Sequence, residues 1–246
     1  MGKLFDDAEG VVVGKYTVEQ INYEDTKPFI LDIHYAKRMP SISYAYGLFD
    51  MNKIIGMVSY GFPPSPALCK GIAGETYKND VLELNRLVLK YNKKNQASML
   101  ISASFKLLPR PKIIVSYADT EQDHTGIVYQ ATNFIYTGLS DKRTEWRIKG
   151  SNLHSKTVCE SYTLEERKKN TDKFIQVDRP RKHRYIYFLG NKLEKKILRN
   201  SLRYKEQEYP KKGQLDIWEY LGVLESLSYA LMLIIGEMQE TINLVW

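Results

Sequence analysis

The chain has 246 residues, 43% of them hydrophobic, which is enough for one large domain with a sizeable core and argues against wholesale disorder. Its formal net charge of +7 favours a polyanionic partner. Two distant cysteines, Cys69 and Cys159, argue against a disulfide framework or a zinc cluster and favour a reducing compartment. The acidic start has no apolar signal segment, and the longest apolar run is too short to span a bilayer, so we expect a cytoplasmic protein without a membrane segment.

The first predicted elements are a strand, a helix and a hairpin. Tyr16–Ile21 is predicted as a strand, and Phe29–Lys37 as a short helix after a break at Lys27 and Pro28. His34 lies on this helix, where a lone histidine is more commonly a structural residue than a ligand. Tyr44–Phe49 and Lys53–Tyr60 alternate like strands, and the polar residues between them favour a hairpin.

A third strand and an amphipathic helix follow. Val81–Leu89 is predicted as a strand with Arg86 in its middle, and a charge there is costly unless it is paired or faces a cavity. Arg86 therefore either bridges an internal carboxylate or faces a site. A helical stripe then runs from Ala97 to Leu108, and the lysines before it, Lys93 and Lys94, could hold an anion together with the free N–H groups of the helix.

The most informative stretch is Lys112–Tyr136. It opens with a β-branched run that predicts a buried strand, with Asp119 at its carboxyl end, where open α/β sheets bind ligands. A polar turn leads to a helix containing Tyr129, with Asp123 or Thr125 as its expected N-cap. The functional interpretation groups these residues with His124 as one site. In the alternative interpretation, the two aspartates only cap the turn.

The remaining chain is strongly basic. Residues 142–205 contain 19 Lys and Arg against 7 Asp and Glu, whereas the rest contains 17 against 22. We interpret this segment as a surface for phosphates, the alternative being a solvated face. Its predicted elements are a strand at Glu145–Lys149, a helix at Leu164–Phe174 and an aromatic strand at Ile186–Leu189. The candidate DNA contacts precede that strand and are Arg179, Arg181, Lys182 and Arg184.

The last predicted element is a helix from Gln214 to Trp246, apolar on nearly all sides in its middle. Such a helix requires burial, so we expect it to support a homodimer or bind a partner. We therefore divide the chain into a domain at residues 1–205 and a helical extension at residues 206–246.

The element order over residues 44–136 resembles the core of a GNAT acyltransferase. Five blocks narrow the resemblance to the phage Mom-type DNA modification proteins, over about residues 29–190: Gly56–Gly61, Glu83–Leu87, Lys94–Ser98, Ser116–Asp119 and His124–Ala131. The resemblance implies a GNAT-like mixed α/β sheet flanked by helices. It also implies an enzyme that converts adenine in duplex DNA to an N6-acetamido (carbamoylmethyl) form, protecting phage DNA from restriction in the host cytoplasm.

Position in the predicted elements selects the catalytic residues. Asp119 lies at a strand's carboxyl end and Tyr129 on the following helix, Arg86 comes from the adjacent strand, and Ser98 opens the helix expected to face the donor. An acyl-CoA-like donor would lie against Lys93, Lys94, Asn95 and Ser98, although this turn lacks the glycines usual in GNAT proteins and the donor is left open. The resemblance also implies iron, and we match His34, Asp119 and His124 to it, because imidazole and carboxylate are suitable ligands for non-haem iron.

Two other functions compete with this one. A conventional GNAT acyltransferase would act on a small amine or a protein lysine, with Tyr129 protonating the thiolate and Glu83 or Asp119 relaying a proton. A non-catalytic DNA-binding protein could keep the same fold without the chemistry. The basic segment favours a nucleic acid partner, and the glycine-free turn weakens the conventional acyltransferase.

Overall fold

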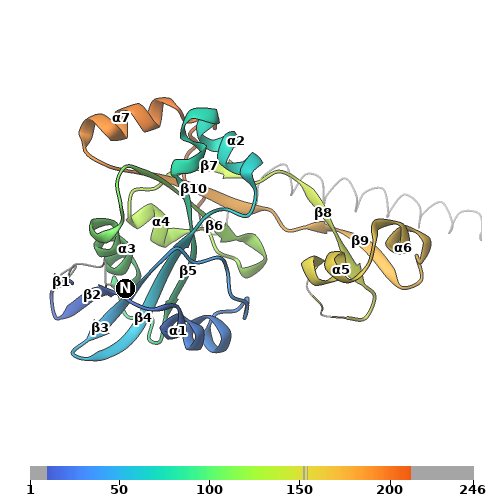
Figure 1. Cartoon of the computed structure of the whole chain (residues 1–246), viewed down its shortest axis with the longest axis horizontal. Helices are drawn as coiled ribbons and strands as arrows, with labels where there is room; N and C mark the ends of the chain where they lie inside the picture. Colours follow the sequence, from blue (N-terminus) through green and yellow to red (C-terminus); the bar gives the residue numbers. More distant parts are fainter. Residues whose placement is uncertain (1–9, 152, 154, 212–246) are drawn as a thin grey trace, which may run out of the picture. The chain divides into compact units, whose positions relative to one another are not determined.

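The computed structural model describes residues 10–211, except residues 152 and 154 (Figure 1). The chain separates into two compact units, Met1–Glu208 and Tyr209–Trp246. The predicted helix at residues 214–246, with its proposed dimer or partner contact, lies outside the described residues. Within the described part, no helix is both long enough and apolar enough to cross a bilayer.

The larger sheet has eight strands in the order β1-β2-β3-β4-β5-β6-β10-β7. It is mixed, because β5 and β6 pair in parallel whereas the other neighbours pair antiparallel. The strands are β1 Val11–Val13, β2 Tyr16–Gln20, β3 Tyr44–Asp50, β4 Lys53–Gly61, β5 Val81–Leu89, β6 Lys112–Asp119, β7 Ile135–Leu139 and β10 Lys182–Leu189. The predicted GNAT-like mixed α/β fold is confirmed, including the β3–β4 hairpin.

Helices cover both faces of the sheet. On one face α3 (Gln96–Leu107) packs Leu100 and Ile101 into a cluster with Ile114 of β6. On the other face α2 (Pro66–Tyr77) and α7 (Lys192–Asn200) pack against Ile113 and Val115 of the same strand. Because neighbouring residues of β6 are buried in opposite directions, its sequence is a continuous apolar run. Neither α2 nor α7 was predicted from the sequence.

The amino-terminal helix differs from its prediction. Instead of one helix at Phe29–Lys37, α1 (Tyr23–Lys27) continues into η1, a π-helix at Pro28–Ile33. The α-helix ends at Lys27 as predicted, and Pro28 is the first residue of the π-helix, where a missing N–H group is tolerated. Phe29 and Ile30 are buried against β4 and β5. His34 therefore follows the helix in extended conformation, rather than lying within it.

Strands β5 and β6 separate after a short contact. Their paired residues are Val81 with Ile113, Leu82 with Ile114, and Glu83 with Val115. Beyond this point β5 continues along β4 to Leu89, while β6 continues along β10 to Asp119. The divergence opens the sheet at the carboxyl ends of the two parallel strands, which is the ligand-binding edge of open α/β sheets.

A β-bulge changes which way the side chains of β5 point. The register with β4 shifts between Ser59–Arg86 and Tyr60–Leu84, which leaves Asn85 as the extra residue. Before the bulge Val81 packs on the α2 face, and after it Val88 packs on the η1 face, while the leucines between them face α3. Glu83 and Arg86, three positions apart, therefore lie on the same side of the sheet. In a strand without a bulge, residues three positions apart would lie on opposite faces.

A second sheet is inserted between β7 and β10. It consists of β8 (Arg143–Ile148) and β9 (Phe174–Arg179), which run side by side, with α5 (Ser155–Ser161) and α6 (Leu164–Lys169) grouped beside them (Figure 1). The predicted strand at 145–149 is confirmed. The predicted helix at 164–174 ends at Lys169, because Phe174 is buried as the first residue of β9.

Candidate active site

The site is built from the opening between β5 and β6. Glu83 of β5 is half-buried, and burial raises the pKa of its carboxyl group, while the charges of Arg86 and Lys182 oppose the shift. Within residues 10–211 its carboxylate has no hydrogen bond or ion pair. The carboxylate of Glu83 is therefore more basic than an ordinary one, and it can accept a proton without first losing a hydrogen bond or ion pair within the described residues.

Arg86 lies on the same side of the sheet and is held by backbone carbonyls. Its Nη1 donates to the oxygen of Asn85 (2.6 Å), and its Nη2 donates to the oxygen of Arg38 (2.8 Å). Its Nε is buried and has no hydrogen-bond partner among the described residues. A buried unpaired donor is costly, and functional sites are where such groups are found. The first alternative for Arg86, a bridge to an internal carboxylate, is not formed among the described residues, and the second, a position that faces a site, stays a prediction.

Asp119 both caps a turn and lies at the site. It is 7% exposed, and its Oδ1 accepts the N–H of Glu121 (3.1 Å) at the start of η3 (Thr120–Gln122). Its Oδ2 accepts from Nζ of Lys182 (2.7 Å), the residue directly opposite on β10, and more weakly from the hydroxyl of Tyr35 (3.4 Å). Both carboxylate oxygens are thus engaged by protein groups.

Rings from two distant parts of the chain meet beside Asp119, His34 and Tyr35 from one part and His124 from the other. Tyr35 stacks on His34, with ring centroids 4.5 Å apart, and lies edge-on to His124 at 6.2 Å. The Nδ1 of His34 accepts the N–H of Ala36 (3.0 Å). Burial, followed by the positive charges of Arg86, His124 and Lys182, lowers the pKa of His34 to about 4. His34 is therefore neutral near pH 7.

The predicted iron ligands do not fit a metal centre as they are arranged. Among the described residues, no group of three or more His, Cys, Asp or Glu side chains could hold a metal ion. The oxygens of Asp119 are occupied, and Nδ1 of His34 is used within its own turn. We derive no step through a metal. The iron requirement remains a prediction, which elemental analysis of purified protein would test.

Tyr129 approaches from the α3 face. It lies on α4 (Ile127–Ala131), and its 9% exposure reflects packing against Tyr185. Burial raises the pKa of Tyr129 to about 12, although a hydrogen bond with Ser116 opposes the shift. The N-cap of α4 is Gly126 and not Asp123 or Thr125, because its φ of +76° suits glycine and a Cβ there would lie 2.4 Å from Tyr185.

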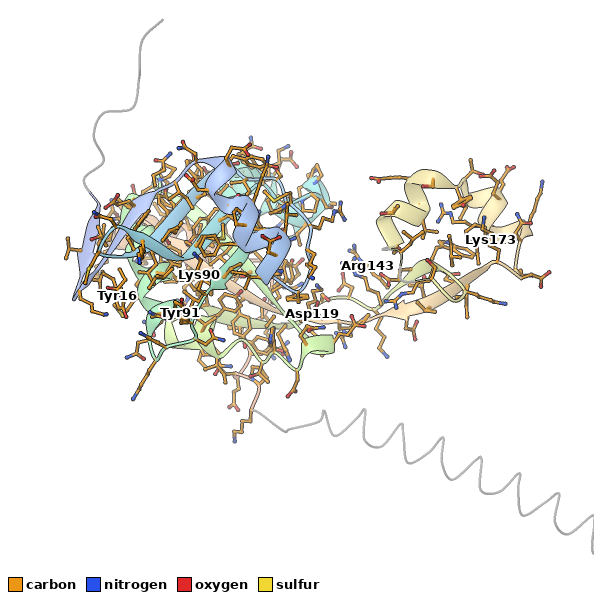
Figure 2. The ribbon with its side chains drawn as sticks, turned by 90° about the horizontal axis from the view of Figure 1, so that it is seen from below. Tyr16, Lys90, Tyr91, Asp119, Arg143 and Lys173 are labelled. Carbon is orange, nitrogen blue, oxygen red and sulfur yellow. The ribbon has the colours of Figure 1, made fainter. Side chains whose placement is uncertain are left out.

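In the turn before α3, several polar groups are bonded to one another or to Tyr16. Buried Gln96 accepts the N–H of Lys93 (3.3 Å) and donates to the hydroxyl of Tyr16 (3.1 Å), and Tyr16 is labelled in Figure 2. The hydroxyl of Ser98 donates to the oxygen of Asn95 (3.1 Å). Lys93, Lys94 and Asn95 are exposed. Donor binding at this turn, and a catalytic role for Ser98, remain predictions.

The predicted DNA contacts need correction. Arg184 is 6% exposed: its guanidinium bonds the side chain and backbone of Thr137 and covers the ring of Tyr204, 3.4 Å from its centroid. Arg181 donates to the carbonyls of Ser140 and Leu139, and Lys182 is paired with Asp119. Arg184 and Lys182 lie on β10 and Arg181 lies directly before it, where neighbouring strands and loops provide internal partners for these cations. Only Arg179 of the four is exposed.

Several site residues escaped the sequence analysis. Tyr35, next to His34, received no role there, and Lys182 was assigned to DNA rather than to Asp119. Glu83 was considered only for a conventional acyltransferase. The bulge at Asn85, which turns Glu83 toward Arg86, has no signal in the sequence pattern.

A separate hollow of about 250 Å³ lies at the opposite edge of the sheet, where β6 begins and β10 ends. Lys106, Arg110 and Lys195 are among its lining residues. It contains none of the predicted site residues.

Comparison with known proteins decides the family. The model of the Mom protein family matches residues 15–211, which is most of the chain. The chain belongs to the Mom protein family. A Mom-family relative, the methylcarbamoylase mom of Escherichia phage Mu, is 29% identical over 217 residues, covering 82% of this chain and 88% of the relative.

Solved acetyltransferases are less similar to this member of the Mom family. A GNAT-family acetyltransferase from Bacillus cereus is 15% identical, with 72% of this chain and 100% of that chain covered and a TM-score of 0.40. The ribosomal-protein-S5-alanine acetyltransferase from Vibrio fischeri is 13% identical, with coverages of 75% and 98% and a TM-score of 0.43. The strand order and the divergence of β5 and β6 define the fold of this chain.

Proposed function

We propose that this protein is a transferase that attaches a carbamoylmethyl group to N6 of adenine in duplex DNA. Membership of the Mom family supports a DNA modification role. The observation that supports catalysis is the pair formed by Glu83 and Arg86 at the opening between β5 and β6. An amine acceptor needs a base, and an anionic donor or leaving group needs a hydrogen-bond donor.

Glu83 is the proposed general base. As the bond between N6 and the transferred carbon forms, N6 must lose a proton, and an unpaired carboxylate with a raised pKa accepts it more readily than an ordinary one. Asp119 is less suited to this step because Lys182 holds its Oδ2 at 2.7 Å. We therefore assign Asp119 to positioning Lys182 and the turn that leads to His124.

Arg86 and Tyr129 are the proposed partners of the donor. The free Nε of Arg86 can donate to an anionic or carbonyl oxygen of the donor. The bond between the transferred carbon and its leaving group breaks as the N6–carbon bond forms. The leaving group then takes a proton from the hydroxyl of Tyr129, which remains protonated at neutral pH because its pKa is about 12.

The acceptor has to leave the base stack to reach this opening. Enzymes that act on a base edge extrude the base and stack it on aromatic side chains. Tyr35 is 50% exposed and its hydroxyl lies beside Asp119, so its ring is available to an extruded adenine.

Nothing specific favours the two competing functions. The turn before α3 contains no glycine, and its Lys93 N–H is already bonded to the oxygens of Tyr91 and Gln96, which weakens the case for transfer from coenzyme A. A non-catalytic binding protein has no use for an unpaired half-buried carboxylate, which is destabilising at neutral pH.

Mass spectrometry of nucleosides tests the proposal. DNA from cells that express the protein should contain N6-carbamoylmethyl-2′-deoxyadenosine, and DNA from cells that express the Glu83→Gln variant at the same level should not. Unmodified adenine in both samples, from protein shown to be folded by its thermal melt, would contradict the proposed function.

A further inference from the structure

We propose that Arg143 and Arg179 form a clamp for a phosphate of the DNA backbone next to the active site. This inference rests on the proposed function, because it names the part of the protein that holds the DNA substrate. Arg143 joins Arg179 as a proposed DNA contact in place of Arg181, Lys182 and Arg184, because the charges of those three residues are bonded inside the protein.

The two arginines are direct cross-strand partners. Arg143 begins β8, Arg179 ends β9, and their Cα atoms are paired in the antiparallel register. Cross-strand partners project from the same face of a sheet with Cβ atoms about 5 Å apart. Two guanidinium groups can thus reach one phosphate, whose oxygens accept several hydrogen bonds in the geometry that arginine offers.

The two faces of the β8–β9 ribbon differ in their contacts. The face opposite to the arginines contains Trp146 and Phe174, which pack against Arg167 of α6 and against Tyr162. On the face of Arg143 and Arg179, Arg147 is neutralised by Glu145, with Nη2 and Oε1 2.7 Å apart. The cationic pair at the end of the ribbon is the part of this face that remains available to an anion.

Neither arginine has a strong internal partner. Arg143 lies 4.0 Å from Asp141, with both side chains largely exposed, and such pairs contribute little. For Arg179, residues 10–211 provide no hydrogen bond and no ion pair. Like charges directly opposite each other destabilise a sheet, so the arrangement costs stability unless an anion lies between them.

The clamp is close to the site. Arg179 precedes Lys182 by three residues, which span at most about 11 Å, and Lys182 is paired with Asp119. The charge of Arg143 also contributes to the pKa of Tyr117 on β6. Arg143 and Asp119 are labelled in Figure 2. Since successive base pairs rise 3.4 Å, the phosphate should lie within about five base pairs of the target adenine.

Salt-dependent DNA binding tests the clamp. We would compare Arg143→Ala/Arg179→Ala with the matched control Lys168→Ala/Lys169→Ala, which removes two exposed charges of α6 in the same inserted segment. Binding to a fluorescein-labelled DNA duplex is measured by anisotropy over a range of KCl concentrations. The clamp variant should bind about 10-fold more weakly, and its slope of log K against log salt should fall by about 1, whereas the control should stay near wild type.

A second measurement separates the clamp from a structural role. Removing two opposed like charges should leave the melting temperature unchanged or raise it, while Arg143→Lys/Arg179→Lys should restore the salt slope but only part of the affinity. Unchanged affinity and slope in the alanine variant would overturn the clamp, as would an equal loss in the control. If wild-type protein modifies DNA normally but the clamp variant binds like it, only this inference fails and the proposed function stands.

Discussion

At the scale of single residues, the carboxylates of Asp119 and Glu83 differ in their bonding partners. Asp119 has the position that sequence reasoning values, at the end of a strand, yet its oxygens are held by Lys182 and by the N–H of Glu121. Glu83, in mid-strand, has a raised pKa and no bond within the described residues. Availability of the lone pairs, and not position in the sequence, identifies the better base.

Glu83→Gln should therefore abolish modification and stabilise the protein. Loss of a general base reduces turnover by roughly 100-fold or more. Because the folded-state pKa of Glu83 is raised above its unfolded value, its contribution to stability is present at acidic pH and lost as the pH rises through the folded pKa. Glutamine should thus raise the melting temperature at pH 7, with the difference vanishing in acid. Thermal melts at the two pH values check this, and a less stable variant at pH 7 would contradict it.

Tyr129→Phe should lower turnover strongly and stability only slightly. The ring stays packed against Tyr185 and Phe134, so stability should fall by only about 1 kcal/mol for the lost hydrogen bond. Turnover should fall by roughly 100-fold, because the proton for the leaving group is missing. Single-turnover nucleoside analysis beside a urea melt measures both. Normal turnover would remove Tyr129 from the mechanism.

At the scale of elements, the bulge in β5 brings the site together. Asn85, its extra residue, accepts from the hydroxyl of Ser59 (2.7 Å) and donates to the carbonyl of Ser41 (2.8 Å). Those bonds hold the strand where it changes face, between Glu83 and Arg86.

Asn85→Ala should accordingly impair activity without removing a group that touches the substrate. Two lost hydrogen bonds cost about 1–3 kcal/mol, and a displaced Arg86 lowers turnover more than it weakens DNA binding. Urea melts, anisotropy and nucleoside analysis would show it. As a control, Asn85→Asp keeps the acceptor for Ser59 and should retain more activity. A variant that loses DNA affinity but keeps its turnover would contradict this role.

At the scale of the whole molecule, the inserted ribbon is a separable part of the described chain. Strands β8 and β9 pair only with each other there, and Val158, Arg167 and Phe174 are buried within the inserted segment. Where the inserted segment joins the larger sheet, the N–H of Ser140 donates a backbone hydrogen bond to the oxygen of Lys182 (2.8 Å), so the two ends of the segment are already held together.

Replacing Arg143–Arg179 by a short Gly-Ser linker should therefore leave the larger sheet folded. We expect the cooperative melt to persist within a few degrees, because loop length affects stability only weakly. DNA affinity should fall at least as far as in the clamp variant. Circular dichroism and anisotropy provide the measurements, and loss of the cooperative melt would show that the ribbon supports the sheet.

The sequence by itself determined the elements whose signals are local. Alternation and β-branched runs placed β3, β4, β5 and β6, helical spacing placed α3, and Asp119 was correctly put at a strand end. These features depend on neighbours within about one turn or two strand residues, which the pattern records directly. Elements without such a signal, such as α2 with its kink at Gly74, were missed.

Only the tertiary structure decided which charges are free. Arg184 and Arg179 are equivalent in the sequence, yet one is buried against Thr137 and Tyr204 and the other is exposed. Lys182 meets Asp119 across 63 residues, and Tyr35 meets it across 84. Such partners are set by strand register and by a one-residue bulge, and a shift of one residue reverses the direction of each side chain. No local pattern contains that information.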